Sequence, residues 1–186
     1  NLMAQNPDIG IIGFKCLFGG DLNKVGHIES AGIKMVSYIP TDIGRDLPGH
    51  RLTGVSNPDA IQWAFSLLRR KAAVGNLQEG IFNGFKGWDD IDNCFAIKAK
   101  GWKIIYCGMG AGYHEPRVTR GDNSEESQRQ NQENGSIFYK RWGLWESYIR
   151  DNPEGQDIHR MPTEVRGIQG LLERTGFQQM REEVAS

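Results

Sequence analysis

Three carboxylates lie within four residues of the chain, at Asp89, Asp90 and Asp92. They follow a glycine-rich stretch and stand at the start of a predicted helix. One aspartate is a common N-cap, and acidic side chains in a first turn interact well with the helix dipole, so a structural interpretation is open. Three like charges, however, crowd one another and raise the pKa of at least one, which suits a general base or a metal ligand. We therefore favour a functional role.

One of the four histidines, His114, follows a strand predicted at residues 102–107 and a glycine-rich turn. A lone histidine is more often a satisfied structural residue than a ligand, and that alternative stays open. The order of the segments, acidic helix start, helix, strand and histidine, predicts that their ends meet in one cleft of an α/β sheet. Arg117 and Arg120 come next, and guanidinium groups beside a metal ligand suit a diphosphate, although alone they are ordinary surface arginines.

The elements that must position these residues follow from the apolar pattern and from the turn residues. In chain order we expect a buried strand at 9–18, a hairpin at 21–39, an irregular loop at 40–58, a strand and short helix at 60–75, a glycine-rich loop at 80–87, a helix at 88–100 capped by Gly101, the strand at 102–107 and a short loop at 108–112. The polar residues 122–134 predict a solvated helix or a mobile loop, flexible in part, and aromatic helical character returns at 137–143.

The composition excludes several classes of protein. The 186 residues predict one globular domain, and a formal charge of -1 gives no basic surface for nucleic acid. Three scattered cysteines predict neither a disulfide framework nor a zinc site. Without a long apolar run or a signal peptide we expect a cytoplasmic protein with no transmembrane segment, and peripheral membrane association stays open. The chain opens on Asn1 rather than Met, so we expect the numbering to start inside a longer polypeptide.

Several motifs resemble, in order, the C-terminal half of family 2 glycosyltransferases. The run G-I-F-N-G-F-K-G-W-D-D-I-D-N-C at 80–94 is similar to the family's "W-E-D-V-D-L-C" stretch, and K-G-W-K-I-I-Y at 100–106 and Y-H at 113–114 are similar to the strand and ending that follow it. The resemblance extends upstream and downstream, to N-P-D-I-G-I-I-G at 6–13, the segments at 27–32 and 64–70, and R-W-G at 141–143. It covers about residues 6–143.

The resemblance implies an α/β fold of the GT-A type, with a mixed sheet flanked by helices. The nucleotide-binding βαβ half of that fold, with its Asp-x-Asp motif, is not recognisable in the chain. Residues 1–143 would form the C-terminal part of the glycosyltransferase domain, and residues 144–186 a helical extension. The implied activity is an inverting, hexosyltransferase-like transfer in polysaccharide biosynthesis, from a nucleotide-sugar donor to a glycan or another hydroxyl acceptor, with the isolated 186 residues inactive.

Residue roles also follow from the resemblance. Asp90 corresponds to the general base, and His114 to the histidine that helps to hold a divalent cation, Mg or Mn. Arg117 and Arg120 would bind the donor diphosphate as cofactor-binding residues. The acceptor-binding residues would be Trp88, Asp89 and Asp92.

Two alternatives remain open. Asp89, Asn93 and Trp63 depart from the family's pattern, and with the missing donor half they favour a non-catalytic, glycosyltransferase-like module that binds a glycan or another partner. A weaker alternative is a stand-alone metal hydrolase that uses Asp90, Asp92 and His114.

Overall fold

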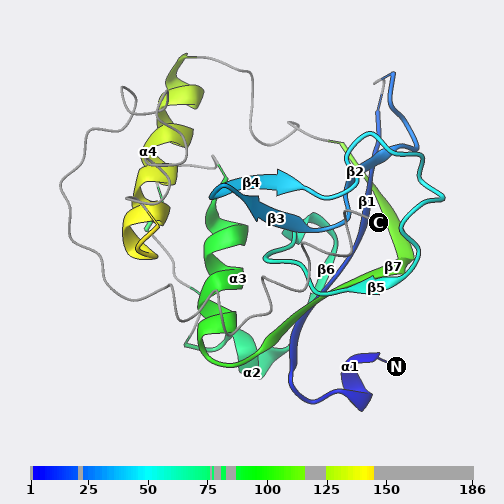
Figure 1. Cartoon of the computed structure of the whole chain (residues 1–186), viewed down its shortest axis with the longest axis horizontal. Helices are drawn as coiled ribbons and strands as arrows, with labels where there is room; N and C mark the ends of the chain where they lie inside the picture. Colours follow the sequence, from blue (N-terminus) through cyan, green and yellow to red (C-terminus); the bar gives the residue numbers. More distant parts are fainter. Residues whose placement is uncertain are drawn as a thin grey trace.

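The computed structural model shows an α/β protein in which helices flank a mixed, curled sheet (Figure 1). The structure describes residues 2–20, 23–75, 77, 81–82, 87–115 and 125–144. The glycine-rich loop predicted at 80–87 therefore lies mostly outside the described residues, and of the predicted extension at 144–186 only Leu144 is described.

Strand β1 (Ile9–Phe18) forms the centre of the sheet. It pairs in parallel with β7 (Lys103–His114) and antiparallel with β2 (Ile28–Ser30) and β6 (Ser66–Leu68). On the far side of β7, the short strand β5 (Val55–Ser56) completes the sheet in antiparallel orientation. Because β1 has neighbours on both edges and side chains packed on both faces, its sequence is an almost unbroken apolar run, and the strand predicted at 9–18 is confirmed.

The hairpin predicted at 21–39 is displaced along the chain. It is formed by β3 (Ile33–Val36) and β4 (Ile39–Asp42), whereas β2 leaves this region to pair with β1. The connecting Ser37 and Tyr38 have φ of 46° and 65°, the left-handed conformation of the two-residue turn whose twist matches a hairpin. Neither residue is a glycine or an asparagine, which is why the turn was not visible in the sequence.

Four helices and one 3-10 turn accompany the strands in the described part of the chain. They are α1 (Leu2–Gln5), η1 (Trp63–Phe65), α2 (Arg70–Ala73), α3 (Asp89–Ala99) and α4 (Glu125–Arg141). Helix α3 ends before Gly101, whose φ of 87° confirms the predicted cap. The helical alternative is confirmed for residues 125–134, which form most of α4.

The core lies on both faces of the sheet. Helix α3 covers one face and α4 packs on α3. Phe95 of α3 and Phe138 of α4 pack edge to face with ring centroids 5.2 Å apart and join a cluster that includes Ile11 and Ile104 of the sheet. Helix α1 lies beside the start of β1 (Figure 1). Its Leu2 and Met3 pack against a second cluster, formed by Ile9, Ile12 and Cys107. The aromatic residues near the end of α4 anchor an otherwise polar helix, because burial of such large rings contributes several kcal/mol.

Strand β7 continues through the glycine-rich segment for which we predicted a short loop at 108–112. Its register with β1 jumps from Phe14↔Cys107 to Lys15↔Ala111, so the intervening residues form a bulge rather than a loop. Gly108 permits the bulge, because a Cβ there would collide with the carbonyl oxygen of Leu52. Strand β7 therefore stays paired with β1 beyond the bulge as far as His114.

Candidate functional site

A cleft of about 760 Å³ opens between the start of α3, the middle of α4, the end of β7 and strands β2 and β4. The described side chains that line it include Trp88, Asp89, Asp90 and His114, four of the residues singled out in the sequence. The start of α3 and the end of β7, which are separate in the sequence, therefore meet at one cleft as expected. The volume lies within the range of small-molecule sites, roughly 300–1,000 Å³.

Trp88 occupies a strained backbone position at the entrance to α3. Its φ is 74°, a conformation that a bulky residue rarely adopts and that costs on the order of 1–3 kcal/mol. Helix α4 holds it there: the indole N–H donates to the backbone oxygen and to Oδ1 of Asn131, at 3.0 and 3.1 Å. The ring packs on Phe138 and Tyr139, with centroids 5.2 and 5.3 Å away. The contacts of Trp88 with α4 therefore fix how α3 begins, and with it the placement of the carboxylates that follow.

The three carboxylates do not act as one cluster. Asp89 is exposed and Asp90 is partly buried, and both line the cleft. The backbone N–H of Ile91 donates to Oδ1 of Asp90 at 2.9 Å. Asp92 lies about 200° around the helix from Asp90 and faces the core instead.

The side chain of Asp92 is 1% exposed. Its Oδ1 accepts a hydrogen bond of 2.6 Å from the Trp142 indole, and its Oδ2 lies 3.1 Å from an Arg141 guanidinium nitrogen. Burial raises the pKa of Asp92, while the bond from Trp142 and the charge of Arg141 oppose that rise. The acceptor-binding role predicted for Asp92 finds no support in this geometry, because its carboxylate joins α3 to the end of α4.

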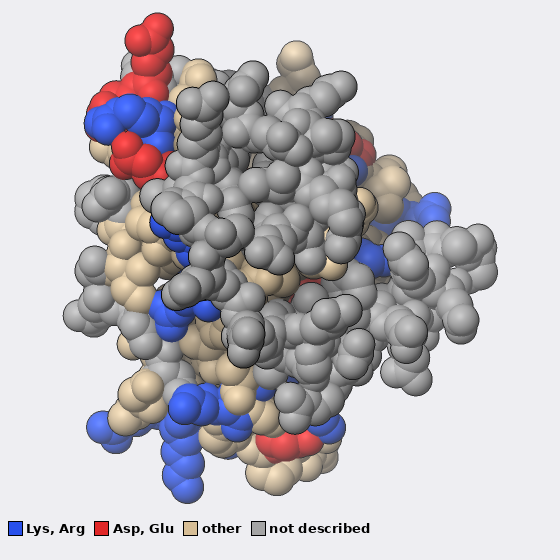
Figure 2. Space-filling view, turned by 60° about the vertical axis from the view of Figure 1, so that its left-hand side comes forward, with Lys and Arg blue, Asp and Glu red and all other residues tan. Residues whose placement is uncertain are grey.

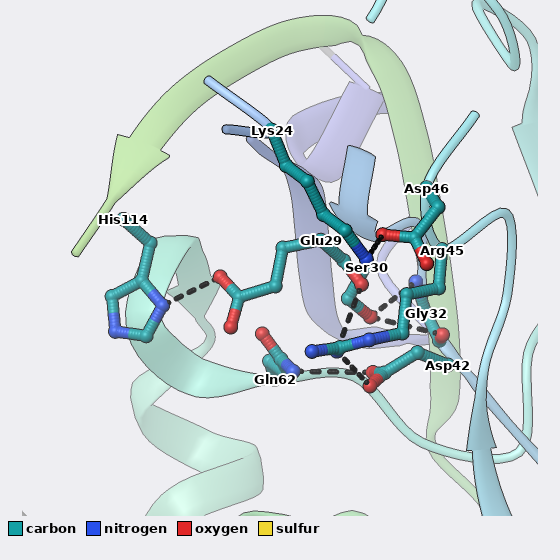
Figure 3. A network of polar contacts seen from close by, with 9 residues as sticks. All are labelled: Lys24, Glu29, Ser30, Gly32, Asp42, Arg45, Asp46, Gln62 and His114. Carbon is teal, nitrogen blue, oxygen red and sulfur yellow. Dashed lines mark hydrogen bonds and ion pairs between the residues drawn. The ribbon is translucent and has the colours of Figure 1, made fainter. Parts of the chain in front are cut away.

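A second wall of the cleft is built by residues that the sequence analysis did not single out. His114 Nδ1 lies 2.7 Å from Oε2 of Glu29, a residue of β2 (Figure 3). The Glu29 side chain is 6% exposed and the His114 side chain 39%, so the histidine lies between a buried carboxylate and the cleft. The one sequence signal for Glu29 was a carboxylate in a short segment that also contains Ile28 and Ala31.

Behind Glu29, polar contacts continue along the same wall, as Figure 3 shows. Arg45 pairs with Asp42 at 2.9 Å, and the Gln62 amide donates to the other carboxylate oxygen of Asp42 at 3.1 Å. Arg45 also reaches the backbone oxygen of Glu29 at 3.5 Å and lies over the Phe18 ring, 5.0 Å from its centroid. Asp42 and Arg45 are three residues apart, whereas Phe18, Glu29 and Gln62 come from other segments, so no spacing pattern connects the whole set.

The described residues contain no group of three or more His, Cys, Asp or Glu side chains arranged to hold a metal ion. The hydrolase alternative with Asp90, Asp92 and His114 is therefore not supported. Arg117 and Arg120, predicted to bind a diphosphate, lie outside the described residues.

The surface and the helices give two further observations. In the face drawn in Figure 2, the basic side chains of the described residues are scattered and mixed with acidic ones. Of the helices in the described ranges, none has the length and apolar character needed to cross a bilayer. Comparison with known proteins finds no matching family model, no similar curated protein and no similar solved structure.

Proposed function

We propose that this cleft is the acceptor side of an inverting glycosyltransferase, which transfers a sugar from a nucleotide-sugar donor to a hydroxyl group. The observation that carries the proposal is that Asp90 and His114 line one cleft. They belong to the two motifs that resemble family 2 glycosyltransferases. The size and polar lining of the cleft suit a hydroxyl-rich ligand.

In the proposed reaction, Asp90 accepts the proton of the acceptor hydroxyl. The acceptor oxygen forms a bond to the anomeric carbon as the bond from that carbon to the diphosphate oxygen breaks, so the configuration inverts and the electron pair leaves with the diphosphate. General base assistance of this kind contributes about 10²–10⁴-fold to a rate. Asp90 suits this role better than Asp92, because only Asp90 lines the cleft.

The resemblance also implies a Mg or Mn ion. The described side chains do not form a complete ligand set for such an ion, so no step of the proposed reaction is assigned to a metal. His114 is the described residue that the resemblance relates to the cation.

A second candidate is a module that binds a glycan without transferring it, and the observation that favours it is that Trp88, Asp89 and Asp90 line the cleft together. Trp88 and the two cleft carboxylates would suit such binding, because sugars present both apolar faces and hydroxyl donors.

The two candidates are separated by a transfer assay on the full-length protein. UDP- and dTDP-sugars are supplied with Mn or Mg, release of the nucleoside diphosphate is measured, and glycan binding is followed by calorimetry. We expect Asp90→Asn to lower turnover at least about 100-fold while donor binding is unchanged. The matched control is Asp8→Asn, since Asp8 is an exposed carboxylate at the start of β1 whose partner is Lys103, 2.6 Å away, and it does not line the cleft.

Turnover that survives in Asp90→Asn would remove Asp90 as the base. Glycan binding by the parent protein with no transfer from any donor would favour the binding module.

A further inference from the structure

The contact between Glu29 and His114 fixes more than the position of two side chains. The backbone of His114 is already held at the end of β7, because it pairs with Phe18 of β1 and its carbonyl accepts the N–H of Gly19 at 2.8 Å. The Nδ1 to Oε2 distance of 2.7 Å then holds the ring itself. The histidine is restrained both at its backbone and at one ring nitrogen.

The chemistry of this contact determines which ring nitrogen carries the proton. An ionised carboxylate only accepts hydrogen bonds, so Nδ1 of His114 must be the donor. In the neutral ring, Nε2 is then the nitrogen with a lone pair. A neutral histidine side chain in water prefers the opposite tautomer, with the proton on Nε2, so Glu29 reverses the ordinary preference.

We propose that Glu29 is a positioning residue, which keeps His114 in the Nδ1–H tautomer with Nε2 as the nitrogen that meets a ligand in the cleft. Because Nδ1 is occupied by Glu29, any polar contact of the ring with a ligand is made by Nε2. A lone pair there accepts a hydrogen bond from a hydroxyl group. Only the statement that the ligand offers a hydroxyl group to Nε2 rests on the proposed function.

Two observations distinguish this role from a purely structural ion pair. Both residues line the cleft, and the ring of His114 is several times more exposed than the carboxylate that holds it. A buried carboxylate is costly unless it is paired, and the pairing partner here is a side chain that faces the ligand space. The arrangement resembles the way carboxylates orient the histidines of metal and catalytic sites through the second ring nitrogen.

The test is the tautomeric state of His114, measured by long-range ¹H–¹⁵N correlation spectra of the full chain labelled with ¹⁵N-histidine, at pH 8. We expect the parent protein to show a protonated Nδ1 and an unprotonated Nε2. Glu29→Gln is expected to keep this state, because the amide oxygen also accepts, whereas Glu29→Ala is expected to shift His114 to the Nε2–H form. Exposed His50 is the internal control and is expected to be identical in all three proteins.

An Nε2–H tautomer or an imidazolium in the parent protein at pH 8 would overturn the inference, as would an unchanged tautomer in Glu29→Ala. If Glu29→Ala does not fold, the parent spectrum and Glu29→Gln still decide, since loss of the Nδ1–H form in a folded Glu29→Gln would also refute it. Methyl α-D-glucopyranoside serves as a probe: its addition is expected to move the Nε2 resonance in the parent protein. If His114 has the expected tautomer but no sugar of a panel changes its resonances, the role of Glu29 is supported and the proposed function is contradicted.

Discussion

Replacement of Asp92 by alanine is expected to lower the free energy of unfolding by about 3 kcal/mol or more. The change leaves the Trp142 indole N–H and the Arg141 guanidinium without the carboxylate that both contact, at 2.6 and 3.1 Å. Removal of one partner from a buried ion pair typically costs about 3–5 kcal/mol, because the other charge stays buried. Arg141 is 23% exposed and keeps part of its hydration, which places the expected value at the lower end.

Asp92→Asn is expected to stay within about 1 kcal/mol of the parent protein at neutral pH. Its amide oxygen still accepts the indole N–H. Asparagine loses the attraction of the carboxylate to Arg141. It also avoids the cost of burying a charge, which is the cost that raises the pKa of Asp92, so the two effects on stability offset each other. A raised folded-state pKa means that the folded protein binds the proton more tightly than the unfolded chain. The stability of the parent relative to Asp92→Asn is therefore highest below the unfolded pKa of about 3.8 and falls as the pH rises through the folded pKa.

The assay is urea unfolding followed by circular dichroism, at pH 4 and at pH 7, with sugar binding measured on each folded variant. Asp89→Ala is the matched control, since Asp89 is exposed in the first turn of the same helix and its loss should cost at most about 1 kcal/mol. Equal destabilisation by Asp92→Asn and Asp92→Ala, or a stability difference independent of pH, would refute the reasoning. An Asp92→Ala variant of parent stability that no longer binds sugar would instead restore the acceptor role.

Two further substitutions test the packing that supports the cleft. Gly108→Ala is expected to destabilise the protein by about 1–3 kcal/mol, because the added Cβ would meet the Leu52 carbonyl. The control is Gly54→Ala, where the Cβ has open space and the change should be neutral within about 0.5 kcal/mol. Similar melting temperatures for the two variants would contradict the close approach at the β7 bulge. Lys98→Met is expected to cost about 3 kcal/mol in urea unfolding, because it leaves Asp59 buried without the ammonium 3.9 Å away. Added Asp59→Asn should recover part of that loss, and strictly additive effects would show that the pair is not coupled.

Elements that depend on local sequence could be predicted. The strand at Ile9–Phe18 has turn residues on both sides of an apolar run, and the helix at Asp89–Ala99 has acidic residues at its start and Gly101 after its end. These signals act over a few residues and need no knowledge of the rest of the fold.

Elements that depend on distant partners could not be predicted. The bulge of β7 exists because Gly108 lies against the Leu52 segment, and the turn at Ser37 and Tyr38 lacks the residues that its geometry favours. Glu29 was missed for the same reason, because its contact with His114 appears only when β2 and β7 pair with the two edges of β1.

The charge distribution of the cleft bears on which substrate it receives. Glu29, Asp42, Asp89 and Asp90 line it, and Arg45 is the lysine or arginine among its described lining residues. Arg45 is itself paired with Asp42, so the cleft is acidic although the whole chain is nearly neutral. A diphosphate would be repelled by such a surface, whereas an uncharged hydroxyl acceptor would find hydrogen-bond acceptors on both walls. This is why we propose that the cleft receives the acceptor and that the donor diphosphate binds outside it.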